Sequence, residues 1–336
     1  MNVHRLQQLL CAFATKRLAV IGDIMLDEFI WGRVCRVSPE APVPVVEVQS
    51  ESHYPGGAAN VARNLKPFCQ SVHIFGLLGR DPSGDRLARL LRNEGILTGY
   101  LVRGENFSTV LKTRIIALHQ QVVRVDRENK GFFSAADTKT TSEQVLKIFK
   151  QLLPSLDGVI FEDYGKGFLN QELKDRLCHM ANGKGMIVAA DPSSSNPLDW
   201  SGVTVIKPNR SEVFDFAGVP SSLVNVSNPL EDKKLLQACE RLQARWDLPQ
   251  LLVTLGEQGM LLVQPGSLPY YIPTRAKEVF DVSGAGDTTI AIYALALCAN
   301  AAPEEAAEIS NHAAGIVVGK LGTATLTREE LEGSFE

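Results

Sequence analysis

Short apolar runs alternate with stretches of helical periodicity along most of the chain, and this alternation limits the fold more than any other feature. Runs of this composition are typical of buried parallel strands, because helices cover both faces of such strands. The helical stretches include 84–95, which ends in a glycine, and 231–246, whose apolar residues share one face. The pattern predicts an α/β protein whose sheet has helices on both faces. The expected strands are RLAVIGD (17–23), VHIFGLLG (72–79), DGVIFEDY (157–164), GMIVAADP (185–192), VTVIKPN (203–209) and LLVTLG (251–256).

Two segments interrupt this alternation. Residues 27–55 contain prolines and the alternating run VPVVEV, without a helical pattern, and residues 107–126 indicate two strands joined by a turn near His119 and Gln120. We expect both segments to form a small β layer, a lid or clasp, outside the main sheet. Because no repeat or linker divides the chain, residues 1–336 are expected to form a single domain.

Composition excludes several classes of partner. The net charge of −4 leaves no basic excess to neutralise nucleic acid or an anionic membrane. The longest apolar segment, Ile290–Pro303, is shorter than the ~20 residues that span a bilayer, and the N-terminal run LLCAFA is too short for a signal peptide. The six cysteines are scattered without a CxxC pair, which argues against a disulfide framework or a zinc site. We therefore expect a cytoplasmic protein that binds neither nucleic acid nor membrane.

Polar residues or glycine follow many of the expected strands. Asp23, Asp163, Asp191, Asn209 and Gly256 each come after an apolar run. Ligands of open parallel sheets bind beyond the carboxyl ends of the strands, so these residues predict one shared site. The alternative for any one of them is that a loop simply begins there.

Two glycine-rich stretches predict contacts with a ligand. In PGGAANVARNL (55–65), Gly56 and Gly57 allow a backbone to approach a ligand closely, and Asn60 can then bind a hydroxyl. The alternative is a tight turn that caps a helix. Taken alone, this stretch is weak support for a binding site.

The stretch DVSGAGD (281–287) carries more information. Gly284, Ala285 and Gly286 precede an apolar helix, where free amides and the helix dipole favour an anion. Asp287 in the same turn is either a capping carboxylate or a general base that deprotonates a hydroxyl. The sequence contains no GxxxxGK[ST] loop, no protein-kinase HRD and DFG motifs and no GxGxxG loop, so other common nucleotide-binding schemes are excluded.

DVSGAGD resembles the second signature of the ribokinase/PfkB family of sugar kinases, and PGGAANVA resembles its first. The resemblance extends from LAVIGDIMLD to KLGTATLT. It implies a ribokinase-like three-layer α/β/α sandwich with a mostly parallel central sheet, a small β lid, and the use of ATP and Mg²⁺. The segments RVSPEAPVPVVEV, DYGKG, KPNRSE and NHAAGIVVGKLGTATL are similar to members that phosphorylate D-glycero-D-manno-heptose 7-phosphate at O1, in the ADP-heptose route to lipopolysaccharide core.

The resemblance also implies roles for individual residues. Asp287 matches the catalytic base, and the amides of Gly284, Ala285 and Gly286 match the anion hole. Glu212 is expected to reach magnesium through water. The residues implied to contact sugar hydroxyls are Asp27, Gly56, Gly57 and Asn60. The residues implied to contact ATP are Lys207, Asn209, Glu212, Thr254, Gly256 and Asn311.

Basic residues of the expected lid suggest an acceptor that already carries a phosphate. Four cations are expected to bind the 7-phosphate: Lys112, Arg114, Arg124 and Lys166 of DYGKG. Asp163 is expected to lie beside the sugar. One alternative is that these are exposed charges that keep a sheet edge soluble. Another is that Asp163 and Lys166 form an ion pair that orders their loop.

Several points distinguish this chain from its relatives. Ser283 stands where threonine is usual, and no HxGH-like nucleotidyltransferase motif occurs, so we expect a stand-alone kinase or the kinase part of a longer protein. A kinase for fructose, ribose or a nucleoside would have little need of the lid cations. A sensor without activity would be expected to lack Asp287. The apolar residues of the lid suggest a homodimer that covers them: Ile30, Trp31, Val43, Val45 and Val46.

Overall fold

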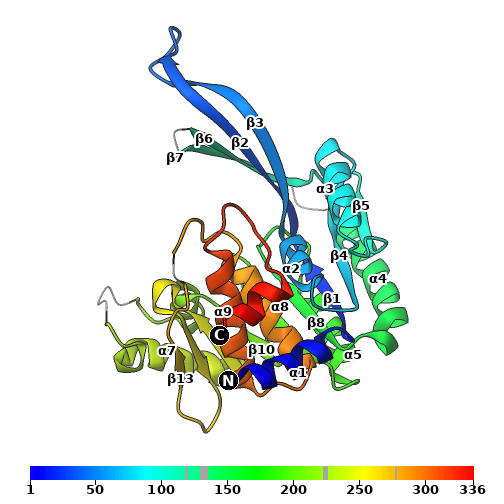
Figure 1. Ribbon diagram of the computed structural model, residues 1–336. Helices are drawn as coiled ribbons and strands as arrows, with labels where there is room; N and C mark the ends of the chain where they lie inside the picture. Colours follow the sequence, from blue (N-terminus) through cyan, green and yellow to red (C-terminus); the bar gives the residue numbers. More distant parts are fainter. Residues whose placement is uncertain (118–119, 129–134, 222–225, 277) are drawn as a thin grey trace.

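The central sheet of the computed structural model is mostly parallel (Figure 1). The structure describes residues 1–117, 120–128, 135–221, 226–276 and 278–336. Within these ranges nine strands form one sheet in the order β13-β12-β11-β10-β9-β8-β1-β4-β5, parallel from β11 to β5 and antiparallel at β12 and β13. The strands are β1 (Arg17–Gly22), β4 (Ser71–Gly79), β5 (Leu101–Gly104), β8 (Gly158–Glu162), β9 (Ile187–Asp191), β10 (Val205–Ile206), β11 (Gln250–Thr254), β12 (Met260–Val263) and β13 (Tyr270–Ile272).

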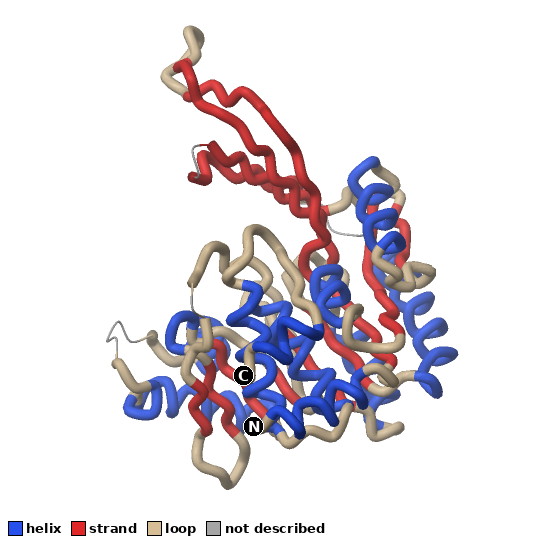
Figure 2. The backbone as a smooth tube through the Cα atoms, in the orientation of Figure 1, coloured by secondary structure: helices blue, strands red, loops and turns tan. Residues whose placement is uncertain are grey.

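Helices cover both faces of this sheet (Figure 2). Successive strand residues point to opposite faces, so Leu18 and Val20 pack with α1, α2, α3, α8, α9 and α10, whereas Ala19 and Ile21 pack with α4, α5, α6 and α7. This confirms the predicted three-layer α/β/α sandwich. The helices are α1 (Val3–Phe13), α2 (Ala58–Leu65), α3 (Pro82–Asn93), α4 (Ala135–Leu152), α5 (Gln171–Asn182), α6 (Arg210–Ala217), α7 (Lys233–Trp246), α8 (Ala285–Cys298), α9 (Pro303–Val317) and α10 (Arg328–Gly333).

The six strands expected from apolar runs are all present, as β1, β4, β8, β9, β10 and β11. β10 is much shorter than the expected 203–209, because Pro208 cannot donate to a ladder and Asn209 already caps helix α6. The expected helix 231–246 begins at Lys233, where the Asp232 side chain accepts a hydrogen bond from Leu235 N.

A second sheet of four strands, in the order β3-β2-β6-β7, projects from the α/β body (Figure 1). We call it the β lid. The antiparallel pair β2 and β3 forms its long hairpin, β6 runs parallel to β2, and β7 returns beside β6. The turn predicted near His119 lies outside the described residues. The strands are β2 (Ile24–Val37), β3 (Pro44–Gly57), β6 (Val110–Ala117) and β7 (Gln120–Arg127).

Helix α8 is almost entirely buried. Every residue from Asp287 to Cys298 is buried, and the helix packs against α2 and α9. Its amino end is therefore held firmly at the point where the β lid joins the body. Among the described residues, no helix has both the length and the apolar character required to cross a bilayer.

Candidate active site

A cleft of about 1040 Å³ opens at the carboxyl ends of β8, β9, β10 and β11. The loops that follow these strands line it, together with the first turn of α8. This is the place at which open parallel sheets bind ligands. Residues predicted from the sequence that line the cleft are Asp163, Lys207, Asn209, Glu212, Thr254, Gly256, Gly284, Ala285, Gly286, Asp287 and Asn311.

The amino end of α8 depends on glycine for its shape. Gly284 caps the helix with φ +84°, in the left-handed region, and a Cβ there would lie 2.6 Å from Asn60 Nδ2. Only glycine fits this position without displacing Asn60. The Ala285 amide already donates to Val282 O at 3.3 Å. The helix dipole still favours an anion at this end of the cleft, and no side chain at Gly284 stands in the way.

Asp287 is buried in this turn between two hydrogen-bond donors. Asn60 Nδ2 donates to Oδ2 at 2.7 Å, and the Tyr164 hydroxyl donates to Oδ1 at 2.9 Å. Burial raises the pKa of Asp287 to about 6; the Asn60 hydrogen bond opposes this rise and the nearby Asp191 adds to it. An oriented carboxylate with a pKa in this range is suited to accept a proton from a hydroxyl.

The buried Asp23 fixes the position of Tyr164. Its carboxylate accepts hydrogen bonds from the backbone N of Tyr164, Lys166 and Phe168, which holds the DYGKG loop against the sheet edge. The Tyr164 ring also lies 5.3 Å from Lys112 Nζ, measured to the ring centre. Tyr164 thus connects Asp287 to the β lid, a role that the sequence did not reveal.

Lys207 lies on the floor of the cleft, beside α8. Its Nζ is 2.8 Å from Asp191 Oδ2, and a Cβ placed on Gly286 would lie 3.2 Å from the same Nζ. Burial would lower the pKa of Lys207, but the carboxylates of Asp191 and Glu162 raise it overall. A charged ammonium group therefore stands next to the glycine-rich turn, where it can bind an anion with the turn's amides.

Asn209 and Glu212 form a capping box at the start of α6. Asn209 Oδ1 accepts from Glu212 N at 3.0 Å, and Glu212 Oε2 accepts from Asn209 N at 2.8 Å. Burial, and secondarily Asp191, raises the pKa of Glu212. The remaining residues assigned to ATP come from other elements: Thr254 ends β11, Gly256 follows it, and Asn311 of α9 donates to Pro273 O at 2.7 Å.

The residues assigned to the sugar hydroxyls come from β2, β3 and α2, on the other side of Asp287. Asp27 is 4% exposed and forms an ion pair with Arg114 of β6. A Cβ on Gly56 would collide with the Asp27 carboxylate, and Gly57 begins α2 with φ +60°. Of these residues, Asn60 contacts Asp287 directly, and Asp27 and Gly56 lie against each other.

Two of the other cations predicted for the acceptor phosphate, Lys166 and Arg124, are also paired. Lys166 Nζ lies 2.8 Å from Glu128 Oε1, and Arg124, whose side chain is 52% exposed, lies 2.9 Å from Asp126 Oδ1. Asp163 instead accepts hydrogen bonds from Asn196 Nδ2 and Gly165 N. The alternative of an ion pair between Asp163 and Lys166 is therefore wrong, because each has a nearer partner.

The sequence assigns no role to two residues of the site, Glu162 and Tyr164. It predicts Asp191 only as one of the polar strand-end residues of a shared site. The signal for Glu162 was a charged residue within the otherwise apolar run GVIFE.

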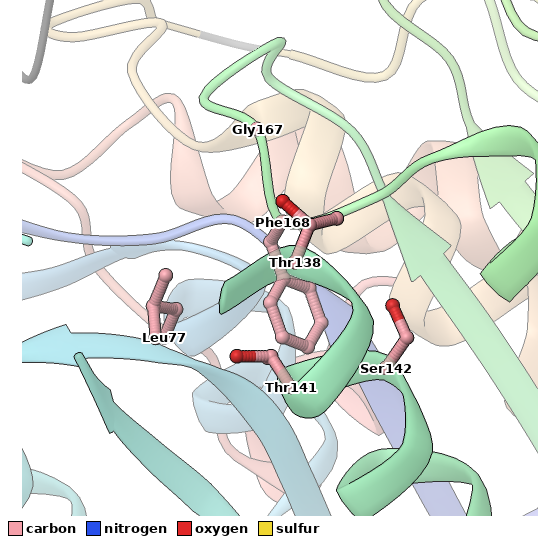
Figure 3. Close-up of a pocket in the computed structure, with 6 residues that line it drawn as sticks. All are labelled: Leu77, Thr138, Thr141, Ser142, Gly167 and Phe168. Atoms are coloured by element: carbon pink, nitrogen blue, oxygen red, sulfur yellow. The ribbon is translucent and has the colours of Figure 1, made fainter. Parts of the chain in front are cut away.

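A second hollow lies between α4 and the end of the DYGKG loop (Figure 3). Its volume of about 10 Å³ leaves room for about one water molecule, and no carboxylate lines it. It is therefore unsuited to a sugar or a nucleotide. Its lining residues are Leu77, Thr138, Thr141, Ser142, Gly167 and Phe168.

Solved structures of two sugar kinases have the same fold. Arabidopsis thaliana ribokinase complexed with ribose and ATP superposes with a TM-score of 0.70 at 18% identity, covering 96% of this chain and 99% of that one. Escherichia coli phosphofructokinase-2 superposes with a TM-score of 0.74 at 18% identity, covering 96% and 98%. At this identity the likeness establishes the fold.

Sequence relatives are closer. A protein of Magnetococcus marinus named "Bifunctional protein HldE" is 42% identical over 330 residues, which cover 96% of this chain and 65% of the relative. Proteins of the same name from Desulfatibacillum aliphaticivorans and Helicobacter pylori are 37% and 39% identical. The chain spans about two thirds of the length of these relatives. Residues 15–330 match the pfkB family carbohydrate kinases, and the chain belongs to this family.

Proposed function

We propose that the protein transfers the γ-phosphoryl group of ATP to O1 of D-glycero-D-manno-heptose 7-phosphate, a cytoplasmic step of ADP-heptose synthesis. The observation that carries the proposal is the position of Asp287. Its buried carboxylate lies at the amino end of α8, between the cleft and the β lid. The match to the pfkB family carbohydrate kinases supports a sugar kinase, and the segments that resemble heptose 7-phosphate kinases support this acceptor.

In the proposed reaction, Asp287 takes the proton of the sugar hydroxyl while the oxygen attacks the γ-phosphorus in line. The bond from phosphorus to the bridging oxygen breaks, and ADP leaves. Asn60 and Tyr164 hold the carboxylate in place. The amides of the first turn of α8 and the Lys207 ammonium stabilise the charge on the phosphoryl oxygens.

ATP fits the part of the cleft beyond Asp287. Asn209, Thr254, Gly256 and Asn311 line it from the ends of β10 and β11 and from α9, as the family resemblance implies. Carboxylate and amide oxygens there, including that of Glu212, suit the oxygen preference of Mg²⁺. Magnesium, when bound with ATP, neutralises part of the phosphate charge.

The lid cations support an acceptor that already carries a phosphate. Burial lowers the pKa of Lys112, Asp27 opposes this, and the charges of Lys166 and Arg114 lower it further. These three cations are therefore close enough to act on one another. A phosphate placed among them would relieve this repulsion, whereas a neutral sugar would not.

The exposed apolar side chains of the lid support a homodimer formed through this sheet. Covering them against a second copy would remove an unfavourable contact with water. Sedimentation that shows only monomer at micromolar concentration would contradict this part of the proposal. The exposed valines are Val37, Val43, Val48, Val122, Val123 and Val125.

A screen of ATP consumption over phosphorylated and unphosphorylated sugars tests the proposed acceptor. We expect the highest kcat/KM with heptose 7-phosphate, and much lower values with fructose, ribose and nucleosides. A variant Lys112→Ala should lose most of this preference. If an unphosphorylated sugar or a nucleoside is the best acceptor, another sugar kinase of the family is the correct assignment.

A further inference from the structure

Two hydrogen bonds between buried side chains cross from helix α2 to the first turn of α8. Asn60 Nδ2 donates to Asp287 Oδ2 at 2.7 Å, and the Thr288 hydroxyl donates to Asn64 Oδ1 at 2.9 Å. Asn64 Nδ2 in turn donates to Asn60 O at 2.9 Å. The proposed reaction uses the first of these contacts and leaves Asn64 and Thr288 without a task.

These contacts fix α2 against α8 at two points. Asn60 and Asn64 are four residues apart, so both lie on the same face of α2, and Asp287 and Thr288 are neighbours in α8. The Thr288 hydroxyl also lies 3.1 Å from Gly284 O, to which it can donate. Asn64 therefore ties α2 to the same turn of α8 that carries the base.

Water does not reach this pair of contacts. Asn60, Asn64 and Thr288 are each 0% exposed. A hydrogen bond within a protein contributes only ~1 kcal/mol net, and apolar groups of the same shape often replace polar partners at little cost, so a leucine in place of Asn64 would hold two helices together about as well. A leucine would not fix the distance and direction of its neighbours, as a hydrogen-bonded amide does. Positioning therefore explains the buried asparagine better than stability does.

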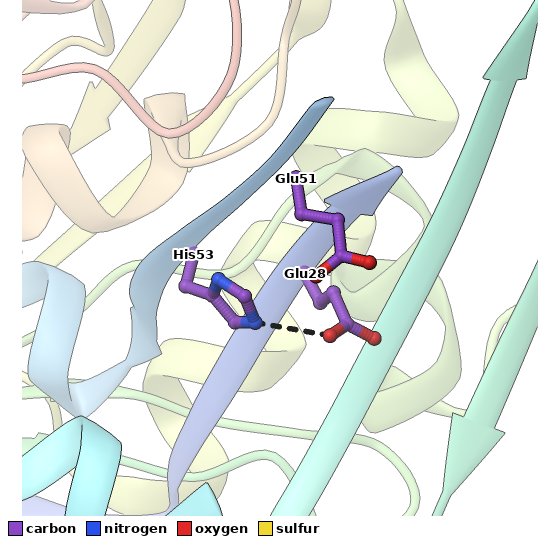
Figure 4. A group of neighbouring side chains, drawn as sticks. All are labelled: Glu28, Glu51 and His53. Atoms are coloured by element: carbon purple, nitrogen blue, oxygen red, sulfur yellow. Dashed lines mark hydrogen bonds and ion pairs between the residues drawn. The ribbon is translucent and has the colours of Figure 1, made fainter. Parts of the chain in front are cut away.

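A second polar group, on the β lid, offers a comparison (Figure 4). There Glu28 lies 3.0 Å from His53 Nε2 and accepts a hydrogen bond from the Thr113 hydroxyl at 2.6 Å, while Glu51 is exposed to solvent. Water therefore reaches part of this group. Thr113 joins two strands of the lid as Thr288 joins two helices, so it provides a matched control.

We propose that Asn64 is a positioning residue for the base: together with Thr288, it keeps Asn60 in hydrogen-bond contact with the Asp287 carboxylate. A leucine in its place would let α2 shift against α8 and lengthen the bond from Asn60 to Asp287. Because that bond opposes the effect of burial on the pKa of Asp287, its weakening would raise this pKa further. The inference deepens the proposed function, on which its catalytic meaning rests.

Other ionisable groups also act on Asp287, and the test leaves all of them in place. Tyr164 donates a hydrogen bond to it, Asp191 and Glu162 repel its charge, and Lys207 attracts it. Substitutions of Asn64 and Thr288 change none of these charges. A change in the titration of Asp287 would consequently report the contact with Asn60.

The test follows the Asp287 carboxyl group by ¹³C NMR during a pH titration of the full chain, without ATP or sugar, and Asp287→Asn identifies its signal. Asn64→Leu and Thr288→Val should titrate at higher pH than wild type. Thr288→Ser, which keeps the hydroxyl, and Thr113→Val on the lid should titrate as wild type does. In an Asn60→Ala background, Asn64→Leu should cause no further change, because Asn64 acts through Asn60.

Steady-state kinetics give a second measurement. At pH 6, Asn64→Leu should lower kcat by ~3–10-fold, whereas at pH 8 kcat should return to within about two-fold of wild type, with KM for ATP unchanged. A purely structural role would lower kcat equally at both pH values.

The inference is wrong if Asp287 titrates as in wild type in both Asn64→Leu and Thr288→Val. If Asn64→Leu does not fold, as judged by circular dichroism, Thr288→Val against Thr288→Ser decides the matter. The NMR titration needs no substrate, so a wild-type protein that fails to phosphorylate the sugar phosphate would contradict the proposed function and not the role of Asn64.

Discussion

The β lid and the floor of the cleft both carry many charged side chains, but they balance those charges in opposite ways. On the lid, acids and bases pair with each other near the surface, as Arg124 does with Asp126 and Glu28 with His53. Such pairs need no ligand, and each contributes little to stability. Side chains of the lid can therefore leave these ion pairs and contact a substrate with little loss of free energy.

On the floor, carboxylates outnumber cations among the described residues: Glu162 and Asp287 are buried, and Asp191 is half-buried. Burial raises the pKa of Glu162, Asp191 and Asp287 together, and Lys207 only partly offsets their mutual repulsion. A protein keeps such an arrangement where ligand or proton chemistry requires it. We therefore propose that the chemical step depends on the floor, whereas the choice of acceptor depends on the lid.

The largest effect is expected from Asp287→Asn on the floor. The amide cannot take the proton of the hydroxyl, so kcat should fall by ~10²–10⁴-fold while the KM values for ATP and sugar change little. Steady-state kinetics measure both. Asp157→Asn, at the opposite edge of the sheet where Asp157 pairs with Lys16, should retain wild-type turnover. If Asp287→Asn retained wild-type turnover, the floor of the cleft would not take part in the chemical step.

A lid substitution should change binding instead of turnover. Lys112→Ala should raise KM for the sugar phosphate by ~10–100-fold, the worth of a hydrogen bond to a charged group, and leave kcat within a few-fold. The control is Arg80→Ala, which removes the same charge at an exposed residue that pairs with Glu105. A fall in kcat without a change in KM would contradict the division between lid and floor.

Tyr164 joins the two regions, so Tyr164→Phe tests how independent they are. Loss of its hydrogen bond to Asp287 should lower kcat by ~3–10-fold. Wild-type activity should rise with pH through about 6 as Asp287 loses its proton. Because the Tyr164 hydroxyl lowers the pKa of Asp287, the phenylalanine variant should show this rise at higher pH. An unshifted pH profile would mean that Tyr164 does not position the base.

The smallest effect is expected from Arg124→Ala. Its side chain is about half exposed and already paired with Asp126, so the free energy of unfolding should change by less than ~1 kcal/mol. The effect on KM should be smaller than that of Lys112→Ala. Denaturant unfolding and kinetics with the sugar phosphate give both values. If Arg124→Ala raised KM more than Lys112→Ala does, the phosphate site would lie further out along the lid.

The parts of the fold that sequence predicts are those set by local patterns. Apolar runs such as that of β8 identify the strands, and the glycines before α8 identify its exposed amino end. The antiparallel strands β12 and β13 were not predicted.

The details of the site depend on contacts between distant residues. Tyr164 and Asn60 reach Asp287 across 123 and 227 residues, and Arg114 reaches Asp27 across 87. A motif identifies Asp287 as a base but does not reveal which side chains orient it. Likewise, the grouping of Glu162 with Asp191 and Asp287 becomes visible only in the folded chain.

The most direct test of the central claim is ³¹P NMR of the products formed from ATP and D-glycero-D-manno-heptose 7-phosphate. We expect a new phosphate signal at the anomeric position and retention of the 7-phosphate signal. Asp287→Asn should form product and ADP ~10²–10⁴-fold more slowly than wild type. Phosphorylation at another hydroxyl, or equal turnover of the sugar without its 7-phosphate, would contradict the assignment of acceptor choice to the lid.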